Sequence, residues 1–137
     1  MGEIDTTMAG AVAFFDRTYD EALALTREAR DYIGGQGASE RRAMTPDAML
    51  VASCEEMRLT ARMTQVMAWL LVQRAVHAGE MTRSQAAAKE HRLSGQDACL
   101  SGPVAPEVEL PARLNDLLSR SRNLYERVQR LDATLDG

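Results

Sequence analysis

The chain has 137 residues, a length that suits one domain, and 16 basic against 20 acidic side chains leave a net charge of −4. This acidic balance disfavours nucleic acid as a partner, because most affinity for phosphates needs a basic face. The two cysteines, Cys54 and Cys99, indicate neither a disulfide framework nor a zinc site, and free thiols suit a reducing cytoplasm.

The start of the chain and its apolar runs bear on location. The first ten residues, MGEIDTTMAG, lack a basic stretch followed by an apolar core, so we expect no secretory signal. The longest apolar run, Val66 to Val72, is far shorter than the roughly 20 residues that cross a bilayer. We therefore expect a cytoplasmic protein with no membrane partner and a single helical-bundle domain over residues 1–137.

The first predicted helix covers about residues 7–33. Its apolar positions recur every three or four residues and so lie on one helical face. They are Met8, Val12, Phe15, Tyr19, Ala22, Ala29 and Ile33. The stretch GGQG at 34–37 predicts the end of this helix, because glycine accepts left-handed backbone conformations. A linker through residues 38–44 is expected to follow.

A second helix is predicted over residues 46–78. Thr45 can cap its N-terminus, and Pro46 suits the first helical position, where its missing N–H costs nothing. Gly79 predicts its end. At roughly 33 residues and 1.5 Å per residue it would span about 50 Å, so we expect it to be the central element of the fold.

This second helix carries a row of mostly polar residues within an apolar sequence: Arg58, Arg62, Gln65, Trp69 and Gln73. They fall on one line along a helix, and tryptophan with arginine is a combination enriched at the energetic centres of protein interfaces. The five residues are therefore candidates for a partner or dimer interface. The alternative is that Trp69 fills the core while the polar groups line its edge, bonded to glutamates of the first helix.

The second half of the chain predicts a short helix, a loop and a long helix. Thr82 with Gln85 forms a capping-box pattern that starts a helix over about residues 83–91. The segment SGQDACLSGPVAPEVELP has no helical period and is predicted to be a loop.

The last helix is predicted over residues 111–135, because its apolar residues repeat with a period of seven, as in a coiled coil. This seam comprises Leu114, Leu117, Leu118, Ser121, Leu124, Tyr125, Val128, Leu131 and Leu135, and the outward face carries Arg113, Arg120, Arg127 and Arg130 among acidic neighbours.

The fold class that follows is all-α, because no alternating pattern of β-branched residues competes with the helical one. We predict an antiparallel helical bundle of three long helices and one short helix. Three helices of unequal length seldom cover a long apolar helix completely. We therefore expect a homodimer, the commonest closed assembly.

No catalytic, cofactor-binding or metal-binding set is predicted. His77 and His91 lack the Glu-x-x-His pattern of di-iron bundles, and His77 suits a helix C-terminus, where the dipole favours a cation. Cys54 has no histidine near it in sequence, so we expect a packed, inert thiol.

Two other functions fit parts of the sequence. The segment AGEMTRSQAAAKEHRL resembles a helix-turn-helix of a DNA-binding regulator, with a recognition helix that begins at Ser84. The row of arginine and glutamine loosely resembles small all-α dimeric enzymes of the chorismate mutase type, which hold a dicarboxylate substrate with arginines. The acidic balance argues against the first, and the absence of a matching arginine pattern in the first helix argues against the second.

Three stretches carry a family resemblance: FFDRTYDEALALTREARDYI, CEEMRLTARMTQVMAWLLVQRAVHAGEMT and RSQAAAKEHRL. Together they cover the chain from about Val12 to Leu93, and the part from MRLT to GEMT is the most specific. They resemble the regulator of CtrA degradation (RcdA) family of alphaproteobacteria. The resemblance lies in whole helices and contains no catalytic signature.

The resemblance implies an adaptor and no enzyme. Members of this family are small all-helical dimers that help the ClpXP protease degrade the cell-cycle regulator CtrA, and they gather at a cell pole. ClpX, CpdR, PopA and CtrA are the partners that it implies. It also implies a flexible C-terminal tail, which we expect to be short here or missing from this sequence.

Overall fold

A computed structural model of the chain describes the backbone of residues 2–136 and the side chains of residues 10–135. These residues form α-helices and short 3-10 helices, and no strand occurs among them, so the all-α prediction is confirmed. No helix in this described part is long and apolar enough to cross a membrane. Met8, which the sequence places on the first apolar face, lies outside the described side chains.

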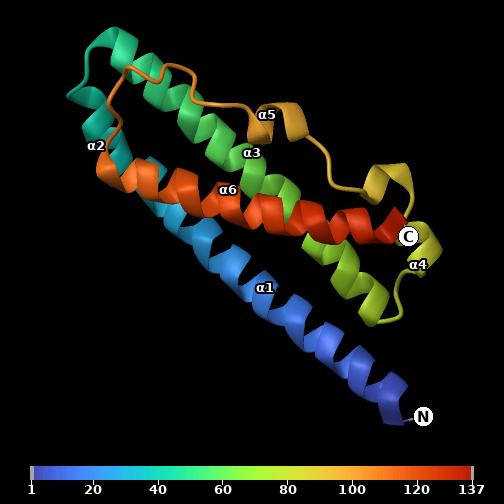
Figure 1. Cartoon of the computed structure of the whole chain (residues 1–137). Helices are drawn as coiled ribbons and strands as arrows, with labels where there is room; N and C mark the ends of the chain where they lie inside the picture. Colours follow the sequence, from blue (N-terminus) through green and yellow to red (C-terminus); the bar gives the residue numbers. More distant parts are fainter. Residues whose placement is uncertain (1, 137) are drawn as a thin grey trace.

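Two long helices, α1 (Gly2–Gly34) and α3 (Pro46–His77), lie side by side and run in opposite directions (Figure 1). The buried face of α1 carries Ala22, Leu25 and Ala29, which belong to the same hydrophobic core as the buried leucines and valine of α3. Small alanine side chains allow two helix backbones to approach closely, which favours long continuous contact along this pair.

The connection between α1 and α3 contains a further helix, α2 (Gln36–Arg42), so the prediction of an irregular linker through residues 38–44 was wrong. Gly37 lies inside this helix without a positive φ. A Cβ atom at Gly37 would lie 2.7 Å from both the carbonyl oxygen and the ring of Tyr32. The glycine therefore permits close contact between α1 and α2 and does not form a left-handed turn.

Polar side chains hold α2 against both long helices. Arg41 Nη1 donates a hydrogen bond to Glu56 Oε2 over 2.6 Å, and its Nη2 donates to the carbonyl oxygen of Ile33 over 3.2 Å. The Tyr32 hydroxyl donates to Glu40 Oε2 over 2.7 Å. These contacts join three helices, so no local sequence pattern could predict them.

The ends of α3 follow their local signals. The hydroxyl of Thr45 accepts a hydrogen bond from the amide of Ala48 over 3.3 Å, with Pro46 at the first helical position. At the other end α3 stops at His77, one residue before the predicted end, and Gly79 adopts a positive φ of 76°. Such a φ is open to glycine at little steric cost.

The segment between α3 and the last long helix, which we call the crossover (residues 78–111), returns along the molecule (Figure 1). The predicted capping box is present: the amide of Thr82 donates to Gln85 Oε1 over 2.8 Å, and the amide of Gln85 donates to Thr82 Oγ1 over 3.0 Å. The helix predicted over 83–91 is broken into α4 (Arg83–Ala86) and the 3-10 turn η1 (Lys89–His91).

The predicted loop that follows contains a helix, α5 (Gln96–Leu100), so that part of the loop prediction was wrong. Gly95, with a positive φ of 77°, precedes α5. Cys99 of α5 is fully buried in the core. The helix α5 has fewer than two turns, which is too short to be stable alone or to show a helical period in the sequence. Burial of Cys99 against the core therefore accounts for its presence.

The last long helix, α6 (Ala112–Ala133), runs beside α3 and in the same direction, because the crossover has returned the chain to the end where α3 begins (Figure 1). The 3-10 turn η2 (Thr134–Asp136) follows it, where the predicted helix over 111–135 was continuous. The seam residues buried in the core are Leu114, Leu117, Ser121, Leu124, Tyr125 and Val128, whereas Leu118 and Leu131 are partly buried and Leu135 is exposed.

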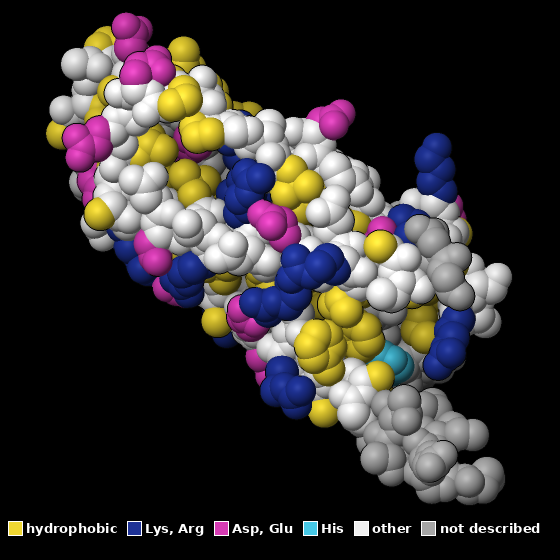
Figure 2. All heavy atoms as spheres, viewed as in Figure 1, with side chains coloured by type: hydrophobic (Ala, Val, Ile, Leu, Met, Phe, Trp, Pro, Cys, Tyr) yellow, Lys and Arg dark blue, Asp and Glu magenta, His cyan; other side chains and the backbone are white. Residues whose placement is uncertain are grey.

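The face that α6 shares with α1 is charged and mixed in sign (Figure 2). Glu28 of α1 pairs with Arg113 over 2.9 Å and with Arg120 over 2.5 Å. Glu21 pairs with Arg127 over 2.7 Å. Three of the four arginines of the predicted outward face thus meet acidic residues of α1, at positions that remain partly open to solvent.

Candidate functional site

The predicted row on α3 lies under the crossover and α6. Arg62, Trp69 and Gln73 are buried, with exposed fractions of 3%, 2% and 7%, and Arg58 and Gln65 are partly buried. The side chain of Trp69 therefore fills the core of this chain. Arg62 and Gln65 bond to groups of the crossover and α6, and Arg58 pairs with Glu55 of α3, whereas the core alternative supposed bonds to glutamates of α1.

Arg62 joins three helices through neutral oxygen atoms. Its Nε donates a hydrogen bond to the carbonyl oxygen of Cys99 over 2.8 Å. Its Nη1 donates to the carbonyl oxygen of Leu118 over 3.0 Å and to the hydroxyl of Ser121 over 3.2 Å. This single side chain thus fixes the positions of α5 and α6 on α3.

The charge of Arg62 is buried without an ion pair to any carboxylate among the described residues. Burial lowers the pKa of Arg62, and the positive charges of Arg58 and Arg122 lower it further. A guanidinium nevertheless stays protonated in proteins, so Arg62 is a buried cation. Its hydrogen bonds to the oxygens of neutral groups offset part of the energy of removing this charge from water.

Trp69 takes part in a second polar cluster, which sequence reasoning missed. Its Nε1 donates to Asp132 Oδ1 over 2.9 Å, and Arg92 Nε donates to the same oxygen over 2.8 Å. The amide of Leu93 donates to this oxygen as well, over 3.3 Å. One signal could have revealed this cluster, because Asp132 falls four residues after Val128 on the buried seam of α6.

Gln65 fixes the middle of the crossover. Its Oε1 accepts hydrogen bonds from the hydroxyl and the amide of Ser94, over 2.9 and 3.2 Å. The Tyr125 hydroxyl donates to the carbonyl oxygen of Ser94 over 2.7 Å, so α3 and α6 hold the same crossover residue. Gln73 differs, because its buried Nε2 donates no hydrogen bond to any described residue.

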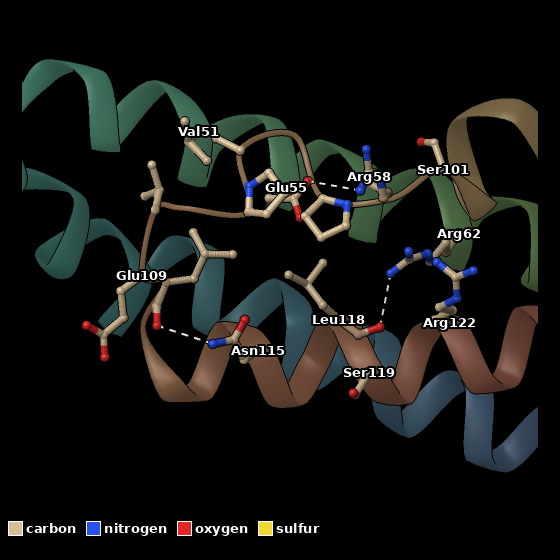
Figure 3. A pocket seen from close by; sticks show the side chains of 15 residues that line it. Val51, Glu55, Arg58, Arg62, Ser101, Glu109, Asn115, Leu118, Ser119 and Arg122 are labelled. Atoms are coloured by element: carbon tan, nitrogen blue, oxygen red, sulfur yellow. Dashed lines mark hydrogen bonds and ion pairs between the residues drawn. The ribbon is translucent and has the colours of Figure 1, made fainter.

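A cavity of about 510 Å³, which we call the crossover cavity, opens between α3, residues 101–110 and α6 (Figure 3). Arg58, Arg62 and Arg122 line it together with Glu55 and Glu109. The rest of the lining is mostly apolar and comprises Val51, Pro103, Ala105, Pro106, Val108, Leu110 and Leu118, with the polar Ser101, Asn115 and Ser119. Two members of the predicted row thus reach one cavity, which the sequence did not reveal.

An apolar groove, which we call the hairpin groove, runs between α1 and α3. Two adjoining cavities of about 510 and 450 Å³ share Ile33 and Thr60 in their linings. Met57 and Leu71 of α3, exposed to 71% and 50%, line one cavity each. The sequence predicts that part of the apolar surface of α3 stays uncovered, but it does not identify the residues that form this groove.

The remaining candidates for chemistry are isolated. Among the described residues, no three His, Cys, Asp or Glu side chains are grouped as metal ligands. Burial raises the pKa of the Cys99 thiol, which disfavours the reactive thiolate. The segment predicted as a DNA recognition helix is broken into α4, with four residues in α-helical conformation, and the 3-10 turn η1.

Comparisons with known proteins agree with this architecture. A family model described as a protein of unknown function, DUF1465, matches residues 7–137. The crystal structure of RcdA from Caulobacter crescentus is 40% identical in sequence, with a TM-score of 0.73, and the match covers 88% of this chain and 89% of that one. No curated protein matches the chain.

Proposed function

Because this chain belongs to the DUF1465 family and is RcdA-like over most of its length, we propose that it is a non-enzymatic adaptor in regulated proteolysis. In this role it helps the ClpXP protease degrade the cell-cycle regulator CtrA through protein contacts alone. Its proposed partners are ClpX, CpdR, PopA and CtrA, and its proposed location is the cytoplasm and a cell pole. These partners and this location are the ones that the RcdA resemblance implies.

The 40% identity to the crystal structure of RcdA over 88% of this chain is the observation that carries this proposal, and the hairpin groove supports its dimeric form. An adaptor raises the effective concentration of a substrate at a protease by binding both, so it needs surfaces that its own core does not use. Leu50, Met57, Thr64 and Leu71 are exposed on α3 and lie seven residues apart from one to the next. A period of seven is the spacing with which one helix packs against another.

We assign the hairpin groove to self-association. A second copy of the chain presents the same stripe, and a two-fold dimer pairs identical surfaces. The charged face that α1 and α6 share then stays free for other proteins. Its intermixed acidic and basic side chains suit a polar, reversible contact in which charge selects the partner.

Two residues of the predicted interface row are proposed to contact a partner directly. Arg58 and Gln65 keep partial exposure, 13% for the Arg58 side chain, so each presents part of its side chain to a protein partner near the crossover. Arg62, Trp69 and Gln73 would contribute indirectly, because they lie beneath the crossover and α6 and support the surface that a partner meets.

A reconstituted degradation reaction tests the adaptor function. CtrA, ClpXP, CpdR, PopA and cyclic-di-GMP are combined, and the rate of CtrA loss is measured with and without this chain. We expect the chain to accelerate the reaction and Arg58→Glu to weaken the effect. Arg42→Glu is the control, because Arg42 is exposed on α2, away from the surfaces proposed for partners and for the dimer. An unchanged rate with all partners present would contradict the function.

Sedimentation of purified protein tests the dimer separately. The double change Met57→Glu and Leu71→Glu places charges in the hairpin groove and should convert the dimer into a folded monomer. Val104→Glu is the matched control, because Val104 and Leu71 are both 50% exposed but Val104 lies on the crossover. If the control and the double variant sediment alike, the groove is not the dimer surface.

A further inference from the structure

The crossover cavity has the size and the mixed lining of a small-ligand site. Its volume of about 510 Å³ lies within the range of roughly 300–1,000 Å³ that is typical of ligand pockets. Figure 3 shows α3 on one side, α6 on the other and the crossover segment 101–110 passing between them. A ligand in this cavity would contact three separate parts of the chain.

Three guanidinium groups meet at the end of the cavity near Ser101: those of Arg58, Arg62 and Arg122 (Figure 3). The positive charges of Arg58 and Arg122 both disfavour the charged form of Arg62. Because arginine remains protonated, this repulsion persists in the folded protein. An anion placed among the three groups would relieve it.

Acidic residues of the lining neutralise this cluster only in part. Glu55 Oε1 lies 3.1 Å from Arg58 Nη1, and Glu109 is exposed at the far end of the cavity (Figure 3). Arg122 pairs with Glu126, which is not a lining residue. Three arginines against two glutamates leave the lining with a net charge of +1, although the whole chain carries −4.

The guanidinium of Arg62 has an unused donor at the cavity. Arg62 uses Nε and Nη1 in its hydrogen bonds, whereas its Nη2 donates none to a described residue. The Oε1 atom of Glu55 is buried and accepts no hydrogen bond of good geometry there, although it is near Arg58. Arg62 Nη2 can therefore donate to an acceptor in the cavity, whereas the Glu55 carboxylate only accepts hydrogen bonds and pairs with Arg58, so it offers an anion no bond.

We propose that the crossover cavity binds a small organic oxyanion, either a carboxylate or a phosphate monoester, that carries a short apolar chain. The oxyanion lies among Arg58, Arg62 and Arg122, because guanidinium groups match the paired oxygens of both head groups. The apolar chain lies along Val51 and Leu118, toward the prolines of the crossover segment. This site goes beyond the protein contacts proposed above and shares Arg58 with them, whereas Arg62 and Arg122 belong to the cavity.

Titration of the full-length chain with three probes tests the proposal without any protein partner. The probes are hexanoate, hexyl phosphate and hexanol, and binding is followed by calorimetry or by NMR shifts of residues around the cavity. We expect at least one anion to bind about tenfold more tightly than hexanol, because charge-assisted hydrogen bonds form only with the anions. The preferred anion identifies the head group. If neither anion binds more tightly than hexanol, the proposal is wrong.

Variants locate the binding. Arg122→Gln and Arg58→Gln should each weaken anion binding about tenfold, whereas Glu55→Gln should strengthen it a few-fold by removing a negative charge. Arg127→Gln is the matched control, because Arg122 and Arg127 are 42% and 38% exposed and each pairs with a glutamate, but Arg127 does not line the cavity. Equal effects of Arg122→Gln and Arg127→Gln would overturn the assignment.

Discussion

The two interfaces of α3 are built on different physical principles. Toward α1, alanines and leucines form a continuous apolar contact, and the two helices are joined by the short α2. Toward the crossover and α6, buried hydrogen bonds from Arg62 and Trp69 reach residues 37 to 63 positions away in sequence. Apolar contact tolerates small shifts, whereas buried polar groups require their own partners. The interface with α1 therefore supplies stability, and the interface with the crossover and α6 fixes the positions of these elements on α3.

The largest test of this comparison is Asp132→Ala. The change leaves the Trp69 N–H and the Arg92 guanidinium without their shared carboxylate. Removing one partner of a buried ion pair should lower the free energy of unfolding by about 3–5 kcal/mol. Urea unfolding measures the loss. Asp97→Ala is the control, because Asp97 is exposed on α5. A loss similar to that of the control would mean that Asp132 does not anchor the crossover.

Arg62→Met should have the next largest effect. It leaves the carbonyl oxygens of Cys99 and Leu118 and the hydroxyl of Ser121 without their donor, which should lower the free energy of unfolding by about 2 kcal/mol. Hydrogen exchange should accelerate first in α5, which Arg62 holds through Cys99. Uniform acceleration across α1 and α3 would instead indicate that Arg62 supports the whole core.

Gly37→Ala tests the close packing of α2 against α1, next to the apolar interface. The new methyl group would lie 2.7 Å from the carbonyl oxygen of Tyr32, so the contact between α1 and α2 must open, at a loss of about 1–3 kcal/mol. Thermal unfolding measures it. Gly34→Ala is the matched control, because its new methyl group would have no atom within 4 Å and alanine favours the helix. Stabilisation by both changes would show that the contact at Gly37 is not tight.

The smallest effect belongs to the charged face of α1 and α6. Hydrogen bonds from Arg120 and Arg113 lower the pKa of Glu28 from 4.5 to about 2. The resulting stability is present above pH 4.5 and is lost as the pH falls toward 2, where the folded carboxylate takes up a proton. Because the Glu28 side chain is one-third exposed, Glu28→Gln should cost only about 0.5 kcal/mol at neutral pH.

Urea unfolding at pH 7 and pH 3 checks this prediction. The difference in the free energy of unfolding between Glu28→Gln and the original chain should shrink at pH 3. It should also shrink in 1 M salt, where the Debye length is roughly 3 Å and exposed ion pairs are screened. A difference that grows on acidification would contradict the assigned direction of the pKa shift.

The sequence predicts those parts of the fold that depend on local signals. Thr45 and Pro46 start α3 because capping acts within one helical turn, and the Thr82 capping box starts α4 for the same reason. The heptad pattern places Leu114 to Val128 on the buried face of α6, because periodicity reports directly on one-sided burial.

The missed parts depend on contacts between distant residues. The helix α5 forms where Arg62 binds the carbonyl oxygen of Cys99, and α2 forms where Gly37 meets Tyr32. The row from Arg58 to Gln73 is indeed set apart from the rest of α3, because it faces the crossover and α6. Its role in binding another protein stays a prediction. The exposed stripe of Leu50, Met57 and Leu71 was missed because one helix presents two apolar faces, and periodicity alone cannot say which is covered.

The route of the crossover has a consequence for the order in which the chain folds. The α1–α3 pair closes over the short α2, whereas the bond between Trp69 and Asp132 must close 63 residues of chain. Closing a longer loop costs more entropy, so contacts of long separation tend to form late. We therefore expect the hairpin to assemble first and α6 to dock afterwards. Asp132→Ala should then accelerate unfolding in stopped-flow experiments and leave the refolding rate nearly unchanged.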